Sequence, residues 1–189
     1  IGVLRSIPNL NIVSPADSLE TIKSIEASLR SKKSTYIRVT GGTNNPIIYE
    51  SDYKFEIGKS ITLKKGNDVT IFGSGAILEN CIIAAKALED KKISTGVVNM
   101  HTIKPIDKEA ILNAAKKSKL IVTVEEHNTI GGLGSAVSEV ISNIKNSPKQ
   151  LTIGINDSYT KSGSYKYLKD YYRLTSEKIL EDVQNLLNE

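Results

Sequence analysis

The sequence predicts an α/β protein in which a three-layer α/β/α domain with a mostly parallel sheet follows a partial β-α-β unit. Its 189 residues allow one full domain and a smaller piece. Hydrophobic residues make up 39% of the chain and charged residues 24%, the balance of a protein with a buried core. Strand-like and helix-like segments alternate through the C-terminal part of the chain, and this alternation indicates parallel strands joined by crossover helices.

The N-terminal part of the chain predicts the partial β-α-β unit. Residues 11–13 form a short strand, and Asp17 begins a helix with a glutamate three residues later, the arrangement of a capping box. A second strand is expected at 35–39, and the glycine-rich segment 41–46 ends it. The polar stretch 47–67 contains one candidate edge strand, and we place the boundary between the two units here.

The larger domain is predicted from strands and helices that follow one another in turn. The expected order is a strand at 69–72, a helix at 76–89, a strand at 94–100, a helix after Asp107, a strand at 120–124, a helix after Gly134, a strand at 151–155 and a final helix after Thr175. Gly73 and Gly75 stand where a dinucleotide-binding fold has its phosphate loop. Leu78 occupies the place of the third glycine, so we interpret the two glycines as a tight turn.

Charge and composition exclude several classes of function. Lysine and arginine number 25 against 21 aspartates and glutamates, a net charge of +4, and the lysines lack the dense stripe typical of nucleic-acid binding. No apolar run approaches the ~20 residues of a membrane helix, and the first residues do not have the pattern of a secretion signal, so we expect neither membrane spanning nor secretion. A single cysteine, Cys81, excludes internal disulfides and favours a cytoplasmic protein. Because the chain opens on Ile1, we expect a fragment or a processed product.

Three features are interpreted as structural. Cys81 lies among apolar helix residues, and His101 has no second histidine at a metal-binding spacing, so neither predicts a site. Five of the eight tyrosines lie in segment 159–172, among lysines. We interpret that segment as a helix that packs on the body of the domain or on a partner, because stacking platforms for nucleic acids are usually built on strands.

The most concentrated polar cluster follows the apolar strand 120–124, at the edge where open α/β sheets place their sites. Its candidate residues are Glu125, Glu126, His127, Gly131, Gly132, Gly134 and Ser135. Two carboxylates beside an imidazole suit acid-base chemistry or a cation, and the start of the next helix suits an anion. The alternative is a loop that orders a subunit contact through hydrogen bonds, and the residue types do not decide between these interpretations.

Arg38 is a second candidate because it ends a strand beside a glycine-rich loop. An arginine at such an edge can hold a phosphate or a carboxylate with two parallel hydrogen bonds. The alternative is an ordinary surface arginine.

Several motifs in one order resemble the C-terminal half of transketolases. They are the segments 4–9, 14–17, 122–127, 131–136, 162–165 and 172–175. The resemblance covers essentially the whole chain and is strongest to compact or split transketolases, with 1-deoxyxylulose-5-phosphate synthase and the β subunits of 2-oxoacid dehydrogenases as relatives. It implies that 1–50 is the tail of a pyrimidine-binding domain, 51–62 a linker and 63–189 the transketolase C-terminal domain.

The resemblance also implies a parent enzyme that uses thiamine diphosphate and Mg²⁺ to transfer a two-carbon ketol unit between sugar phosphates. In that family the glutamate that activates the cofactor lies upstream of the matching segment. The Gly-Asp-Gly motif that holds the diphosphate and Mg²⁺ is absent here, and Asn44 and Asn45 have no such partner motif. We therefore expect this chain alone to bind neither cofactor nor metal, to contain no catalytic residue and to be inactive.

By the same resemblance, Arg38 binds the sugar phosphate and the 125–135 cluster contributes to a subunit interface. The implied partners are the missing N-terminal half or subunit, a second copy in a homodimer and the sugar phosphate substrate. The alternatives are a non-catalytic assembly domain, or a fragment of 1-deoxyxylulose-5-phosphate synthase or of a 2-oxoacid dehydrogenase β subunit, of which the last requires a lipoyl-domain partner.

Overall fold

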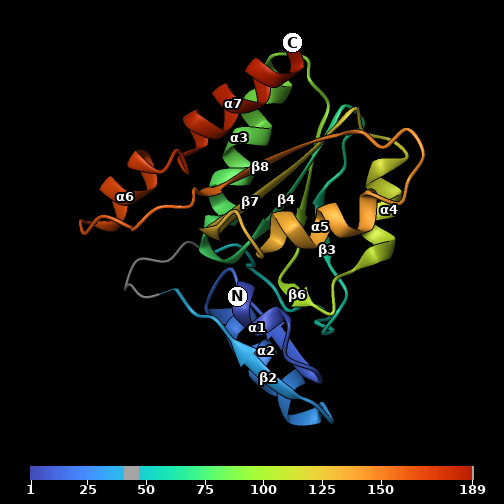
Figure 1. Ribbon diagram of the computed structural model, residues 1–189, viewed down its shortest axis with the longest axis vertical. Helices are drawn as coiled ribbons and strands as arrows, with labels where there is room; N and C mark the ends of the chain where they lie inside the picture. Colours follow the sequence, from blue (N-terminus) through green and yellow to red (C-terminus); the bar gives the residue numbers. More distant parts are fainter. Residues whose placement is uncertain (41–46, 189) are drawn as a thin grey trace.

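The computed structural model describes residues 1–40 and 47–188, whose strands form two sheets (Figure 1). The smaller sheet has the order β2 (Ser34–Ile37), β1 (Leu10–Val13), β6 (Thr102–Lys104), and the larger has the order β3 (Ile61–Lys64), β5 (Thr95–Asn99), β4 (Val69–Ser74), β7 (Leu120–Asn128), β8 (Lys149–Ile155). The predicted glycine-rich loop 41–46, with Asn44 and Asn45, lies outside the described residues.

Helices cover both faces of the larger sheet. The helical segments are α1 (Gly2–Arg5), α2 (Ser18–Arg30), the 3₁₀ turn Gly75–Ile77, α3 (Leu78–Asp90), α4 (Lys108–Ala115), α5 (Leu133–Ile141), α6 (Tyr165–Tyr171) and α7 (Ser176–Asn188). Figure 1 shows α3 and α7 on one side of the larger sheet and α4 and α5 on the other. The predicted three-layer α/β/α architecture is therefore confirmed.

The larger sheet is parallel except at its β3 edge. β4 pairs in parallel with β5 and β7, β7 pairs in parallel with β8, and β3 runs antiparallel to β5. Successive side chains of a strand point to opposite faces. Accordingly, Ile71 and Val122 pack with α3 and α7, whereas Phe72 and Ile121 pack with α4 and α5, and all four are fully buried.

The smaller sheet contains the predicted β-α-β unit, because β1 and β2 pair in parallel and α2 connects them along the chain. The predicted helix start at Asp17 is confirmed, with a variant of the capping box in which Glu20 bonds to the amide one residue before the cap. The Asp17 carboxylate accepts a hydrogen bond from the Glu20 amide at 2.8 Å, and the Glu20 carboxylate accepts one from the Ala16 amide at 2.7 Å.

The sequence analysis missed β6, which runs antiparallel to β1. Its three residues are too few for an alternating pattern to stand out from the sequence. After β5 the chain leaves the larger sheet, adds β6 to the smaller sheet and returns as α4. This excursion ties the two predicted units together, and the domain limits at 50 and 63 stay a prediction.

Two strands extend beyond their predicted ends. β7 continues to Asn128 because β8 pairs with it as far as Ile155, so the residues predicted as a polar loop begin on a strand. β4 continues through Gly73 and Ser74, so the predicted tight turn was placed too early; the chain reverses at Gly75, whose φ of +77° suits glycine.

The tyrosine-rich segment forms α6, which projects from the body of the molecule (Figure 1). Tyr172 packs against the core under α3 and α7, whereas Tyr159 is fully exposed. Within the described ranges, no helix combines the length and the apolar character that crossing a bilayer requires.

Candidate functional site

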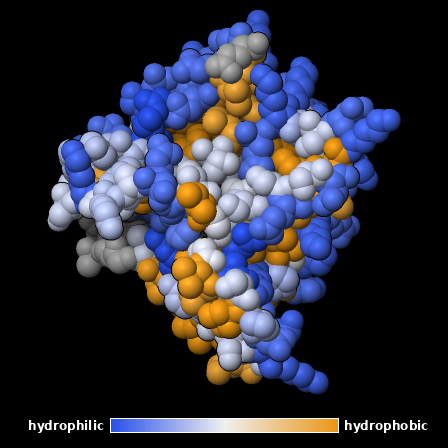
Figure 2. Space-filling view, viewed as in Figure 1, coloured by the Kyte–Doolittle hydropathy of each residue, from blue (hydrophilic) through white to orange (hydrophobic). Residues whose placement is uncertain are grey.

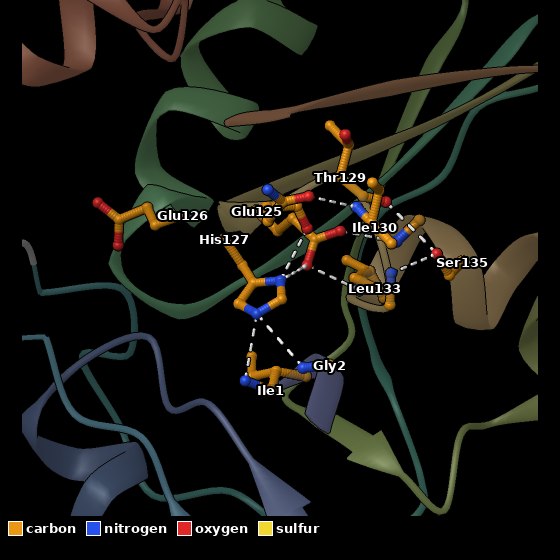
Figure 3. A network of polar contacts seen from close by, with 12 residues as sticks. Ile1, Gly2, Glu125, Glu126, His127, Thr129, Ile130, Leu133 and Ser135 are labelled. Atoms are coloured by element: carbon orange, nitrogen blue, oxygen red, sulfur yellow. Dashed lines mark hydrogen bonds and ion pairs between the residues drawn. The ribbon is translucent and has the colours of Figure 1, made fainter. Parts of the chain in front are cut away.

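The predicted polar cluster is organised around the carboxylate of Glu125, which is 1% exposed. β7 carries this side chain to the start of α5, where it accepts hydrogen bonds from the amides of Leu133 at 2.7 Å and Gly134 at 2.8 Å (Figure 3). The first amides of a helix have no partner inside the helix, and the helix dipole favours a negative charge there. Burial raises the pKa of Glu125 above its usual value, and the two amides oppose that rise.

Glycines allow this close approach of a carboxylate to the backbone. A Cβ at Gly132 would lie 2.0 Å from Glu125 Oε2, so no other residue fits there without a shift. Gly131 has a φ of +79°, and a Cβ on it would lie 3.0 Å from the Cα of Gly2. The Ser135 hydroxyl accepts a hydrogen bond from the Gly131 amide at 2.8 Å and holds the turn closed. The anion at the start of α5 is thus a side chain of the same chain.

His127 lies between the Glu125 carboxylate and the first residues of the chain (Figure 3). Its Nδ1 is 2.7 Å from the carbonyl oxygen of Asn128 and 3.7 Å from Glu125 Oε2, and its Nε2 is 3.2 Å from the nitrogen of Ile1 and 3.3 Å from that of Gly2. Burial lowers the pKa of His127 below its ordinary value, so the ring is neutral near pH 7. A neutral ring that donates from Nδ1 and accepts at Nε2 satisfies these neighbours.

Arg38 follows a strand of the smaller sheet and contacts β7, the strand that carries Glu125 and His127. It directly follows β2, and its Nη2 donates a hydrogen bond to the carbonyl oxygen of Glu126 at 2.8 Å. The Glu126 carboxylate points away from Glu125 and His127 (Figure 3), and it accepts hydrogen bonds from the hydroxyls of Thr40, at 3.2 Å, and Tyr165. The structure therefore joins the two candidate sites that the sequence analysis treated separately.

Tyr165 and Arg5 are members of this site that the sequence analysis missed. Tyr165 comes from α6, and Arg5 donates a hydrogen bond to the carbonyl oxygen of Gly131 at 3.2 Å. Both lie far along the chain from their partners. Their segments, 4–9 and 162–165, were noted only as parts of the resemblance, because their contacts with this site depend on the arrangement of the sheets.

The chemistry open to this site is anion binding rather than metal binding. Within 1–40 and 47–188, no group of three His, Cys, Asp or Glu side chains could hold a metal ion. Arg38 is half-buried, and within these residues its guanidinium makes a hydrogen bond through Nη2 only. The remaining guanidinium nitrogens can receive the oxygens of a phosphate or carboxylate.

A second buried polar cluster, around Glu20, escaped the sequence analysis. The Glu20 carboxylate is fully buried and accepts hydrogen bonds from Asn99 Nδ2 at 2.8 and 3.1 Å and from the Tyr53 hydroxyl at 3.0 Å. Burial raises the pKa of Glu20 to about 7. Asn99 also donates to the Tyr49 hydroxyl at 2.7 Å. Because Asn99 ends β5, this cluster links α2 to the larger sheet.

The two residues set aside as structural are buried. Burial raises the pKa of the Cys81 thiol well above its usual value, so it is not a reactive thiolate. Burial also lowers the pKa of His101 to about 4, and its ring stacks on Phe55 with the centroids 4.2 Å apart.

The chain is similar to known proteins over nearly its whole length. The family model "Transketolase, C-terminal domain" matches residues 58–179. A putative transketolase C-terminal section from Methanocaldococcus jannaschii is 40% identical over 186 residues, 97% of this chain and 57% of the relative. An apulose-4-phosphate transketolase subunit from Phocaeicola vulgatus is 38% identical over 95% of this chain and 57% of its own length.

A solved structure gives the same likeness in three dimensions. A structure described as a split gene transketolase, inactive beta4 tetramer, superposes with a TM-score of 0.90 at 35% identity, over 99% of this chain and 60% of its own. This chain thus spans a little over half the length of these relatives. The motifs, the fold and these matches agree, and the chain belongs to the transketolase family as a C-terminal section.

Proposed function

We propose that this chain is the C-terminal portion of a thiamine-diphosphate-dependent transketolase that transfers a two-carbon ketol unit between sugar phosphates. In that enzyme it would contribute a subunit interface and a grip on the substrate phosphate. The observation that carries this proposal is the position of Arg38, which lies where the end of β2 meets the end of β7 and, among the described residues, uses only Nη2 in a hydrogen bond.

The part of the active site that holds the cofactor belongs, in this proposal, to another portion of the enzyme. The strand-to-helix turn at Gly73–Gly75 is filled, since a Cβ at Gly73 would lie 2.9 Å from Cys81 Sγ and the Gly75 amide donates to the carbonyl oxygen of Ser14 at 3.1 Å. This filled turn leaves no room for a diphosphate, and the described residues contain no group of three His, Cys, Asp or Glu side chains placed to hold a metal ion. In this proposal, residues of this chain bind and orient the substrate, and the chemical step takes place in the other portion of the enzyme.

What this chain would do is orient the substrate. Arg38 is held through Nη2 by the carbonyl oxygen of Glu126, so its planar guanidinium presents a fixed edge. Such a fork binds the phosphate with two parallel hydrogen bonds and loses little side-chain entropy on binding.

Reconstitution tests this function directly. The chain is combined with the N-terminal portion encoded by the same organism, thiamine diphosphate, Mg²⁺, a ketose phosphate donor and an aldose phosphate acceptor. We expect ketol transfer by the mixture and none by the chain alone. Turnover by the isolated chain, or its tight binding of thiamine diphosphate in a calorimeter, would contradict the proposal.

The role of Arg38 has its own test in the reconstituted enzyme. We expect Arg38→Ala to raise KM for a phosphorylated donor by about tenfold or more, because a hydrogen-bonded charge pair is lost. KM for a donor without a phosphate should stay unchanged. Arg30→Ala, at an exposed position of α2, is the matched control. An equal effect on both donors would show that Arg38 has no contact with the phosphate.

A non-catalytic assembly domain is the second candidate, and one observation favours it. Large apolar side chains of the N-terminal part are exposed, among them Val3 at 85% and Leu29 at 83%, and Figure 2 shows apolar atoms gathered over the region of α1, α2 and β2. Sequencing the gene upstream of Ile1 separates the candidates. A pyrimidine-binding domain with its catalytic glutamate there supports the transferase, and an unrelated domain supports assembly alone.

A further inference from the structure

Among the described residues, α4 and α5 leave the β3 edge of the larger sheet open on the face that they cover. They pack on each other and on β7, α5 reaches β8, and Val98 of β5 belongs to the core beneath them. A cleft of about 460 Å³ occupies this place. Gly96, Val98 and Thr62 form its floor on the strands, and Asn113 and Lys117 stand on the α4 side.

The cleft is basic. Its lining includes the lysines Lys59, Lys64, Lys65 and Lys117 and the two acids Asp107 and Glu109. Both acids are already engaged. Asp107 accepts hydrogen bonds from the amides of Ser60 at 2.8 Å and Ala110 at 3.2 Å, and Glu109 pairs with Lys59 at 3.3 Å. Neither acid therefore competes strongly for the remaining ammonium groups.

Among the described residues, two lysines of the cleft and some of its neutral polar side chains have no hydrogen-bond or ion-pair partner. Among the described residues, Lys65, Lys117, Thr62 and Asn113 make no side-chain hydrogen bond or ion pair, whereas Lys64 pairs with Glu89. All four unpartnered side chains belong to exposed residues. An ammonium group is a strong point-charge donor to a phosphate, and hydroxyl and amide groups suit the polar remainder of a small ligand.

We propose that this cleft binds a small phosphate ester of about the size of a hexose phosphate. Lys65 and Lys117 hold the phosphate, and Thr62 and Asn113 contact the rest of the molecule. The volume lies in the range of about 300–1,000 Å³ that is typical of small-molecule sites. The charge of the lining is complementary to a dianion and places no free carboxylate beside it.

This site is separate from the Arg38 site and does not rest on the proposed function. The cleft runs along β3 and β5 as far as Ser60 and Asp107, but the two lysines proposed to hold the phosphate, Lys65 and Lys117, lie just before β4 and β7 begin. Arg38 lies at the far end of β7, beside Glu126. Parallel strands place these two ends at opposite edges of the sheet. Binding at the one site can therefore be measured while the other is disabled.

The test is an amide NMR titration of the 189-residue chain with glucose 6-phosphate, and with glucose as the uncharged comparison. We expect saturable shifts at the amides of Thr62, Lys65, Asn113 and Lys117 with glucose 6-phosphate, and none with glucose. The variant Arg38→Ala should keep these shifts. No saturable shift at these amides, or shifts confined to the neighbourhood of Arg38, would overturn the cleft proposal and leave the proposed function standing.

A charge-matched pair of variants completes the test. The double variant Lys65→Glu/Lys117→Glu should bind glucose 6-phosphate about tenfold more weakly or worse, because two attractive charges become repulsive. The control Lys86→Glu/Lys145→Glu makes the same charge change at exposed positions outside the cleft and should bind normally. Equal weakening in both double variants would show that binding depends only on the net charge of the protein, and it would overturn the proposal. Lys65→Gln/Lys117→Gln repeats the measurement without introducing new carboxylates.

Discussion

At the scale of single residues, the site depends on one buried carboxylate that ends a strand and begins a helix. Glu125 satisfies two amides of α5 that have no other partner, and His127 and Gly132 pack around it. Glu125 therefore joins β7 to α5, and its side chain is buried away from water. That arrangement explains why so many polar residues gather within a short stretch of sequence.

Removing this carboxylate should destabilise the protein. Glu125→Ala leaves two buried amides without an acceptor, and we expect the free energy of unfolding to fall by about 2–4 kcal/mol. Urea denaturation followed by circular dichroism measures the change. Glu139→Ala, on the exposed face of the same helix, removes only the ion pair with Arg5 and should cost less than about 1 kcal/mol. Equal losses of unfolding free energy in the two variants would mean that Glu125 stabilises the protein no more than a surface residue does.

Glu20 predicts a dependence of stability on pH. The folded protein keeps this proton up to about pH 7, while the ordinary value for a glutamate is 4.5. Its contribution to folding is therefore complete below pH 4.5 and declines as the pH rises to about 7, by about 3 kcal/mol. The nearby charge of Asp17 acts in the same direction as burial.

The variant Glu20→Gln isolates this effect. Unfolding free energies of the wild type and the variant are measured between pH 4.5 and 8. The advantage of the wild type should shrink as the pH rises and level off above the folded-state value. Parallel pH profiles for the two proteins would show that Glu20 titrates normally.

The sequence identified most of the charged members of the site, but it missed Arg5 and Tyr165 and did not show which residues contact one another. Glu125, His127 and Arg38 were all singled out, because charged residues after strands mark the usual edge for sites. Their pairing depends on which strands lie side by side, and a single sequence does not contain that information. Glu20 was recognised only as the partner of the helix cap Asp17, since Asn99 lies on a distant strand.

At the scale of elements, periodic segments were predictable and short or polar ones were not. The apolar part of β7 was evident from composition, whereas the segment from Glu125 to Asn128 is a strand because Ser74 of β4 pairs with Glu125 and Ile155 of β8 pairs with Asn128. Conversely, α2 and α4 begin where Asp17 and Asp107 cap them, as local chemistry requires. β6 shows the limit, because three residues are defined by their neighbour β1 alone.

The start of α5 yields a prediction at this scale. Gly132→Ala introduces a Cβ into the place of the Glu125 carboxylate, so the helix start must move, and we expect a loss of about 1–3 kcal/mol in thermal or urea unfolding. Gly163→Ala is the control. There the added Cβ would meet the ring of Tyr167, an exposed side chain that can turn aside. A loss at Gly163 as large as that at Gly132 would contradict the packing argument.

At the scale of the whole molecule, the two sheets behave as one unit because polar and backbone contacts cross between them. β6 pairs with β1, and Asn99 at the end of β5 donates to Glu20 on α2. The Arg38 and Glu126 contact adds a third connection. We therefore expect a single cooperative unfolding transition rather than separate melting of the two parts.

Asn99→Ala tests this coupling. The change leaves the Glu20 carboxylate without its main side-chain donor and should cost about 2–4 kcal/mol. Because the Asn99 bond lowers the pKa of Glu20, its loss should also move the pH window of the Glu20 effect upward. Asn113→Ala, at an exposed position, is the control. Far-ultraviolet circular dichroism and tyrosine fluorescence should give coincident curves for the wild type, and distinct midpoints would argue against one cooperative unit.

The detour of the chain through β6 bears on how this polypeptide could be divided. A single cut between residues 51 and 62 would break the covalent link between the two parts but leave the hydrogen bonds between β1 and β6 intact. The two pieces could therefore associate again through this strand pair. A piece that begins at residue 63 would contain β6 but not β1, the strand with which β6 pairs. The fold is thus suited to complementation between severed halves and poorly suited to excision of either half.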